Sequence, residues 1–169
     1  PVKSGLVASL NRPSGNLTGI NFFNAELTAK RLELLRALLP RAARVAVMVE
    51  TTSPATETTL RDIEPAARAM GLQFEVVRTS TGSEINAAFA TFARERPDAL
   101  FLAGGSIFTG RRFQLVHLAT RYAVPAMFPQ REYPEIGGLM SYGSNVRDAY
   151  HQAGVYAGRI LKGAKPADL

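Results

Sequence analysis

Apolar residues recur along the chain in two alternating patterns, one with a helical period and one continuous. From residue 24, leucines return at helical spacing up to Pro40, which predicts an amphipathic helix capped by Asn24. The run RVAVMV at 44–49 then predicts a buried strand. The alternation continues to residue 128, so the pattern indicates strands separated by helices.

The remaining expected strands are short apolar segments: LTGINF (17–22), FEVVRT (73–78), DALFLAG (98–104), VPAMF (124–128) and LMSYG (139–143). Strands connected through helices pair in parallel, and parallel sheets are covered on both faces. We therefore expect an α/β fold with a doubly wound parallel sheet.

Local signals mark the starts of two of the intervening helices. Ser53 as N-cap and Pro54 as the first helical residue predict one start, and Pro65 should bend this helix or mark a second start. Thr81 and Glu84 have the spacing of a capping box. A final helix is expected from about Asn145 to Lys162. The apolar faces of the three middle helices are expected to contain Leu60, Ile63, Ala67 and Met70; Ile85, Ala88, Phe89 and Phe92; and Phe113, Val116 and Ala123.

Composition excludes several classes of chemistry. The 169 residues are 46% hydrophobic and contain no cysteine, so thiolate catalysis, disulfides and cysteine-ligated metals are excluded. The net charge is +6, but the 20 Lys and Arg residues are scattered along helices and do not form a stripe, which argues against nucleic-acid binding. No apolar run reaches the roughly 20 residues that a membrane span needs.

Ligands of open parallel sheets bind beyond the carboxyl ends of the strands, so the loops that leave the strands are the candidate site. These loops are 50–56, 79–84, 104–110 and 129–135, and they are rich in hydroxyl groups and glycine. In the first loop, Thr51, Thr52 and Ser53 place hydroxyls beside a helix N-terminus, which suits an anionic ligand group. The simpler interpretation is that Ser53 only caps its own helix.

Two other candidates also have alternative interpretations. Arg131, next to Glu132 and Tyr133, can grip a carboxylate with two hydrogen bonds or can form a solvated surface pair. Phe108, in a loop flanked by glycines, can stack on an apolar ligand or close the core under the sheet.

Catalysis has little support in the sequence. His117 and His151 both fall within expected helices and away from the strand ends. No GxSxG, Walker A, HExxH or GxGxxG motif occurs, so we expect no enzyme, no cofactor and no metal site. The loop TTSPATETT faintly resembles the phosphate loop of flavodoxins but lacks its glycine, and receiver domains would need an aspartate cluster at the strand ends. Both remain minor alternatives.

Four segments together resemble one family. They are GLVASLNRPSGNLTGINF (5–22), AKRLELLRALLPRAARVAVM (29–48), GGLMSYGSN (137–145) and RILKGAKPADL (159–169). In this order they resemble the substrate-binding proteins of ABC transporters, in the family that includes tryptophan- and tyrosine-type binding proteins. The resemblance covers essentially the whole chain.

The resemblance implies a Rossmann-like lobe of a type I periplasmic binding protein, with partial segments of a second lobe. Residues 1–22 would be a remnant of the N-terminal lobe and the first hinge crossover, 23–138 the C-terminal lobe, and 139–169 the return crossover and a helix that packs on the N-terminal lobe. The rest of that lobe, with a signal peptide, is expected ahead of Pro1. The implied ligand contacts are Thr51, Thr52, Ser53, Ser106, Phe108, Gln130, Arg131 and Glu132, and the implied hinge residues are Asn21, Phe22 and Tyr142.

The function implied by the resemblance is that of a periplasmic or lipid-anchored receptor. Such a receptor binds a small molecule, an amino acid or an aromatic acid, and delivers it to the membrane permease of an ABC importer. The alternative is the ligand-sensing domain of a transcription regulator, which can share the fold. Without its first lobe, the chain is expected to expose apolar residues of both terminal segments and to self-associate through them.

Overall fold

A computed structural model describes residues 5, 7–9, 16–20 and 26–169, and the expected cap Asn24 lies outside these residues. The chain divides into two compact units. One unit contains Asn24–Gly143, and the other contains Pro1–Phe23 and Ser144–Leu169. The lobe boundaries expected from the sequence stay a prediction.

The larger unit is built on a five-stranded sheet. Its strands are β1 (Arg44–Glu50), β2 (Gln73–Thr79), β3 (Ala99–Leu102), β4 (Ala126–Phe128) and β5 (Met140–Ser141). They pair in the order β2-β1-β3-β4-β5, and each pair is parallel. The expected α/β fold with a parallel sheet is confirmed.

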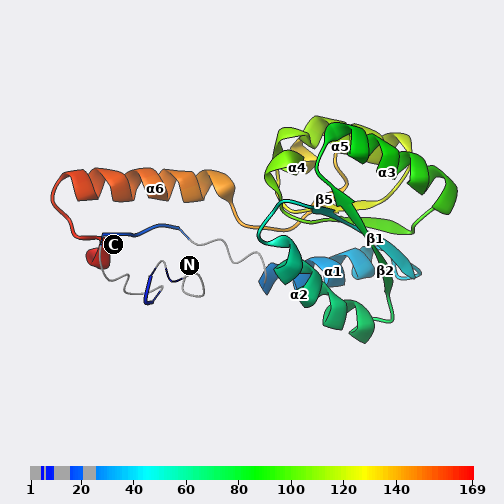
Figure 1. Ribbon diagram of the computed structural model, residues 1–169, viewed down its shortest axis with the longest axis horizontal. Coiled ribbons are helices and arrows are strands. Elements are labelled where there is room, and N and C mark those ends of the chain that lie inside the picture. Colours follow the sequence, from blue (N-terminus) through cyan, green and yellow to red (C-terminus); the bar gives the residue numbers. More distant parts are fainter. Residues whose placement is uncertain (1–4, 6, 10–15, 21–25) are drawn as a thin grey trace. The chain divides into compact units, whose positions relative to one another are not determined.

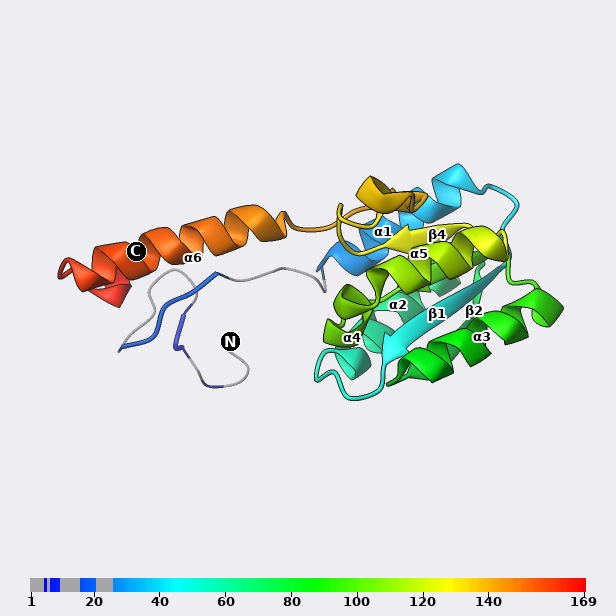
Figure 2. The same ribbon diagram turned by 90° about the horizontal axis from the view of Figure 1, so that it is seen from above.

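Helices cover both faces of this sheet (Figures 1 and 2). On one face lie α1 (Glu26–Leu38) and α2 (Thr56–Ala69), and on the other lie α3 (Gly82–Glu95), α4 (Ser106–Gly110) and α5 (Arg112–Arg121). A 3₁₀ turn at Pro134–Ile136 precedes β5. Each face has its own apolar core, because alternate residues of β1 point to opposite sides: Val45, Val47 and Val49 to one, and Ala46 and Met48 to the other.

The predicted cap Thr81 at the start of α3 is confirmed, and the reciprocal contact of Glu84 falls one residue earlier than in a capping box. The Thr81 side chain accepts a hydrogen bond from the Glu84 backbone N–H at 3.2 Å. The Glu84 carboxylate reaches back to the backbone N–H of Ser80, one residue before the cap. The first contact satisfies a donor that the first turn of the helix leaves free, and the second ties the residue before the cap to the helix.

The predicted start of α2 at Ser53 is wrong. The helix begins at Thr56 with Ala55 as N-cap, which makes no side-chain capping bond. Ser53 instead belongs to a turn, because its N–H donates to the Glu50 carbonyl at 3.2 Å and its hydroxyl accepts from the Ala55 N–H at 3.3 Å. Pro65 lies inside α2, and the helix continues through it without a second start.

Two positions predicted to face inward on α5 are exposed. Phe113 is 63% exposed, and Ala123 lies after the helix with a positive φ of 52°. The buried face instead contains Leu115, Val116, Leu118 and Ala119. The chain forms the separate short helix α4 before α5 begins at Arg112.

The smaller unit contains the helix α6 (Val146–Leu161), capped by the Asn145 side chain, and a 3₁₀ turn at Pro166–Asp168. No residue of α6 is buried. Residues 17–20 of the expected LTGINF strand are not in a strand, because no described segment pairs with them. Across the described residues, no helix has the length and apolarity of a membrane span.

Asp98 joins the starts of β1 and β3 and makes stability depend on pH. Its carboxylate accepts hydrogen bonds from the backbone N–H groups of Arg44 and Ala43, both at 2.8 Å. These bonds, that of Arg44 first, hold the pKa of Asp98 below its usual 3.8. A lowered folded pKa contributes stability above the ordinary pKa, and this contribution is lost as pH falls through the folded value.

We therefore expect Asp98→Asn to lower the free energy of unfolding at pH 7 by at most about 1 kcal/mol, since water screens this exposed carboxylate. The difference from the parent should close once the pH falls below the folded pKa. Urea denaturation of both proteins across pH measures this. A constant difference down to the lowest pH would show that the charge is not responsible.

Candidate functional site

The carboxyl ends of the parallel strands bring several polar loops to one edge of the sheet. After β2, the chain crosses to the other side of β1 to form β3, so the strand order reverses between β1 and β3. Ligands of open α/β sheets bind at this switch point, outside the carboxyl ends of the strands. The loops after β1 and β3 therefore lie where a ligand is expected.

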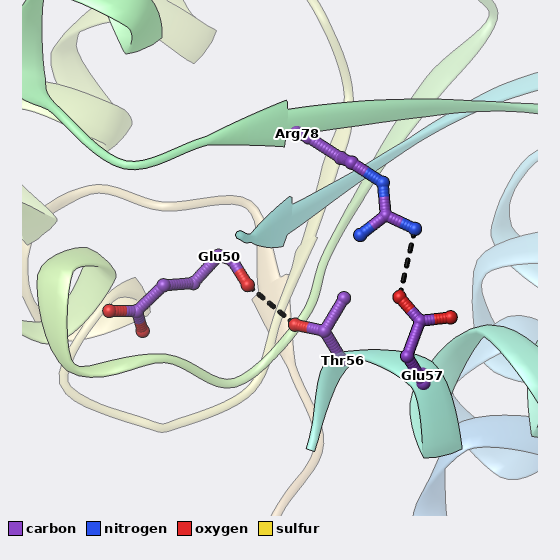
Figure 3. Close-up of polar contacts among 4 residues, drawn as sticks. All are labelled: Glu50, Thr56, Glu57 and Arg78. Carbon is purple, nitrogen blue, oxygen red and sulfur yellow. Dashed lines mark hydrogen bonds and ion pairs between the residues drawn. The ribbon is translucent and has the colours of Figure 1, made fainter. Parts of the chain in front are cut away.

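The loop after β1 is held by its own backbone. The Thr51 N–H donates to the Thr79 carbonyl at 3.0 Å and extends the pairing with β2. Thr56, at the start of α2, donates from its hydroxyl to the Glu50 carbonyl at 2.5 Å (Figure 3). These bonds hold the exposed side chains of Thr51 and Thr52 at the sheet edge, with Ser53 half-buried.

Glu50 connects this loop to the one after β3. Its carboxylate Oε1 accepts a hydrogen bond from the Ser106 hydroxyl at 3.0 Å and a longer one from Thr52 at 3.5 Å. The residue is 7% exposed. Figure 3 shows its side chain pointing away from the neighbouring ion pair of Glu57 and Arg78, which joins α2 to β2 at 2.9 Å.

Ser106 and Phe108, both predicted contacts, have different environments in α4. Ser106 faces Glu50 at the edge. Phe108 is fully buried and belongs to the core with α3 and α5. Its burial agrees with the alternative in which Phe108 closes the core, and a contact between Phe108 and a ligand stays a prediction.

The loop after β4 carries Gln130, Arg131 and Glu132. Arg131 forms an exposed ion pair with Glu135 at 2.9 Å, as the surface-pair alternative expects. Glu132 is half-buried, and its Oε2 has no hydrogen-bond partner within the described part of the chain. Gln130 is half-buried.

Tyr133 anchors this loop in the core. Its ring stacks on Phe128 with centroids 4.7 Å apart, and burial raises the pKa of its hydroxyl. The expected hinge residue Tyr142 is 40% exposed, and its N–H donates to the Phe128 carbonyl at 3.3 Å. The other two hinge residues, Asn21 and Phe22, lie outside the described residues.

Only some of the predicted site residues are brought into contact at this edge. Ser106 is joined to Thr52 through Glu50, whereas the loop of Gln130 follows β4, the next strand along the sheet. His117 and His151 are exposed on helices. Within the described ranges, no group of three or more acidic or histidine side chains has a metal-binding arrangement.

Sequence reasoning missed Glu50 and Arg31. Glu50 is the acid that directly ends the apolar run of β1. Arg31 lies on the leucine stripe of α1, one turn from Leu27 and Leu35, and this spacing could have indicated a buried charge.

Arg31 bonds two neighbouring strands of the sheet from inside the core. It is 5% exposed and donates to the carbonyls of Leu102 in β3 and Met127 in β4. Its guanidinium lies 4.2 Å from the centroid of the Phe101 ring. Burial lowers the pKa of Arg31 to about 9. The guanidinium therefore stabilises the sheet close to the edge where the loops begin.

Comparisons with known proteins agree with this fold. The chain belongs to the ABC transporter substrate binding protein family, which matches residues 1–169, and the resemblance seen in the sequence is confirmed. A curated relative, the tyrosine-binding protein of Clostridioides difficile (strain R20291), is 24% identical over 169 residues. The match covers 100% of this chain and 48% of that protein, so the chain spans about half the length of this relative.

Two solved structures share the fold over the whole chain. One is an ABC domain from Streptococcus pneumoniae in complex with L-Trp, with a TM-score of 0.84 and 24% identity. The other is a conserved domain protein from Vibrio cholerae O1 biovar El Tor, with a TM-score of 0.85 and 20% identity. In both, the match covers 100% of this chain and 56% of the other.

The role of Arg31 can be tested with Arg31→Lys. A lysine ammonium cannot reach two carbonyls and lie flat on Phe101 at once, so we expect a loss of about 1–3 kcal/mol in the free energy of unfolding. Urea denaturation measures it. Arg68→Lys is the control, because Arg68 forms an exposed helix-surface pair with Glu64 and should tolerate the change. Equal effects of the two substitutions would contradict this role.

Proposed function

We propose that this chain forms the ligand-binding second lobe of a solute receptor of an ABC importer. The receptor holds a small molecule between two lobes and delivers it to a membrane permease, and no bond is made or broken. The observation that carries the proposal is the family match over residues 1–169, together with the polar loops at the switch point of the sheet.

The proposed contacts are the side chains that the structure leaves at or near the carboxyl edge: Thr51, Thr52, Ser53, Ser106, Gln130, Arg131 and Glu132. Asn21, Phe22 and Tyr142 are proposed for the crossovers between lobes, with boundaries near residues 22 and 138. Contacts from both lobes to one ligand would favour the closed state over the open one. Closure would then present the loaded receptor to the permease.

The ligand is proposed to be an amino acid or an aromatic acid. The tyrosine-binding relative and the L-Trp complex support this class. A receptor of this kind would work outside the cytoplasm, in the periplasm or on a lipid anchor.

Binding is tested by calorimetry on the complete protein encoded by the gene, against amino acids and aromatic acids. We expect Thr52→Val to weaken binding about 3- to 10-fold, the value of one lost hydrogen bond. Thr120→Val, an exposed position at the C-terminal end of α5, is the control and should bind like the parent. The proposal fails if no compound of either class binds, or if the bound compound is converted to a product.

We also propose that the 169-residue chain self-associates through α6. Val155 and Leu161 of this helix are 41% and 88% exposed, and burying such side chains is favourable. A symmetric dimer that pairs α6 of one copy with α6 of the other would bury these side chains in both copies.

Light scattering should therefore show a dimer for the 169-residue chain and a monomer for the double variant Val155→Asp, Leu161→Asp. Phe113→Asp is the control, because Phe113 is also exposed, at 63%, but belongs to the other unit. A monomeric parent chain, or a dimer lost equally in the Phe113 variant, would contradict the proposal.

A further inference from the structure

Glu50 is a buried acid that has no basic partner among the described residues. None of the four ion pairs found in the described part of the chain includes it. Burial of an unpaired carboxylate is costly, because the protein must replace the water that would solvate the charge. Nearby Glu57 shows the ordinary case, since it is exposed and paired with Arg78.

The surroundings of Glu50 satisfy its carboxylate only in part. Two hydroxyls, of Ser106 and Thr52, reach Oε1. An ionised carboxylate has about four acceptor positions on its two oxygens, and no described donor is bonded to Oε2. Capacity for further donors therefore remains on this side chain.

Gly105, which has no side chain, leaves the space that the Glu50 carboxylate occupies. A Cβ placed there would lie 2.5 Å from Glu50 Oε2. Gly105 has an extended backbone, with φ −178° and ψ 149°, that any residue can adopt. The position of the Glu50 side chain, and not backbone conformation, is therefore what excludes a larger residue here.

Glu50 also lies at the point where a ligand is expected. It is the last residue of β1, and its hydroxyl partner Ser106 follows β3, so the pair spans the switch point of the sheet. A bound cation at this point would supply the positive charge that no described side chain places beside Glu50.

We propose that Glu50 binds a protonated amine of the ligand. This inference rests on the proposed function and narrows its ligand class to solutes that carry an amine, such as amino acids, as opposed to aromatic acids without one. The ammonium donates to the Glu50 carboxylate, while Thr52 and Ser106 hold the carboxylate in place.

The test compares ligands with and without the amine on the complete protein. The probes are L-tryptophan and L-tyrosine, each paired with its deamino analogue, 3-indolepropionate and 3-(4-hydroxyphenyl)propionate, followed by the other amino acids. Calorimetry should show the amine form binding about 10- to 100-fold more tightly, as expected for a hydrogen bond between charged groups.

Glu50→Gln should abolish this preference while binding the deamino analogue no more weakly than the parent does. Glu57→Gln is the matched control, because it removes a carboxylate seven residues along that is already paired, and it should keep the preference. Thermal unfolding of each variant checks that it is folded, and the comparison of ligands on the parent protein does not depend on any variant.

The outcomes separate this inference from the proposed function. If the parent binds aromatic acids as tightly as their amino counterparts, or if Glu50→Gln weakens both forms equally, Glu50 only joins the two loops and the inference fails while the receptor function stands. If no compound of either class binds, the receptor function itself fails.

Discussion

Burial of the central strands on both faces determines where polar chemistry can occur in this protein. Every residue of β3, and every residue of β1 after Arg44, is buried between the two helical layers. Functional polar groups can therefore collect only where the strands end, and the parallel pairing brings those ends to one edge. The crossing of the chain from β2 to β3 places the loops of β1 and β3 next to each other there.

Two buried charges support this edge from opposite sides. Arg31 approaches from the face of α1 and bonds the carbonyls of β3 and β4. Glu50 follows Ala46 and Met48 on the other face and bonds Ser106. Neither has an oppositely charged partner in the described part of the chain, yet their environments differ. Arg31 is enclosed by backbone carbonyls and an aromatic ring, whereas Glu50 lies at the edge with acceptor capacity left.

The sequence was sufficient for the five strands of the sheet, their parallel pairing and the loops that leave them, because these depend on local apolar runs and on the alternation with helices. It was insufficient where a distant contact decides the outcome. Serine is a common N-cap residue, but Ser53 forms hydrogen bonds within the turn after β1, and α2 begins only at Thr56. Phe113 has the spacing of an inward position with Val116, but in the first turn of α5 it is 63% exposed while Val116 is buried. Glu50 is buried by a loop 56 residues away, which no local pattern records.

Hydrogen–deuterium exchange of the complete protein, with and without ligand, tests most directly whether the carboxyl edge is the binding site. The account predicts slower exchange on ligand addition at residues 51–56, 104–108 and 129–132, and unchanged exchange at the opposite edge, around Gln73 and Pro97. Protection confined to that opposite edge, or absent from the loops after β1 and β3, would contradict it.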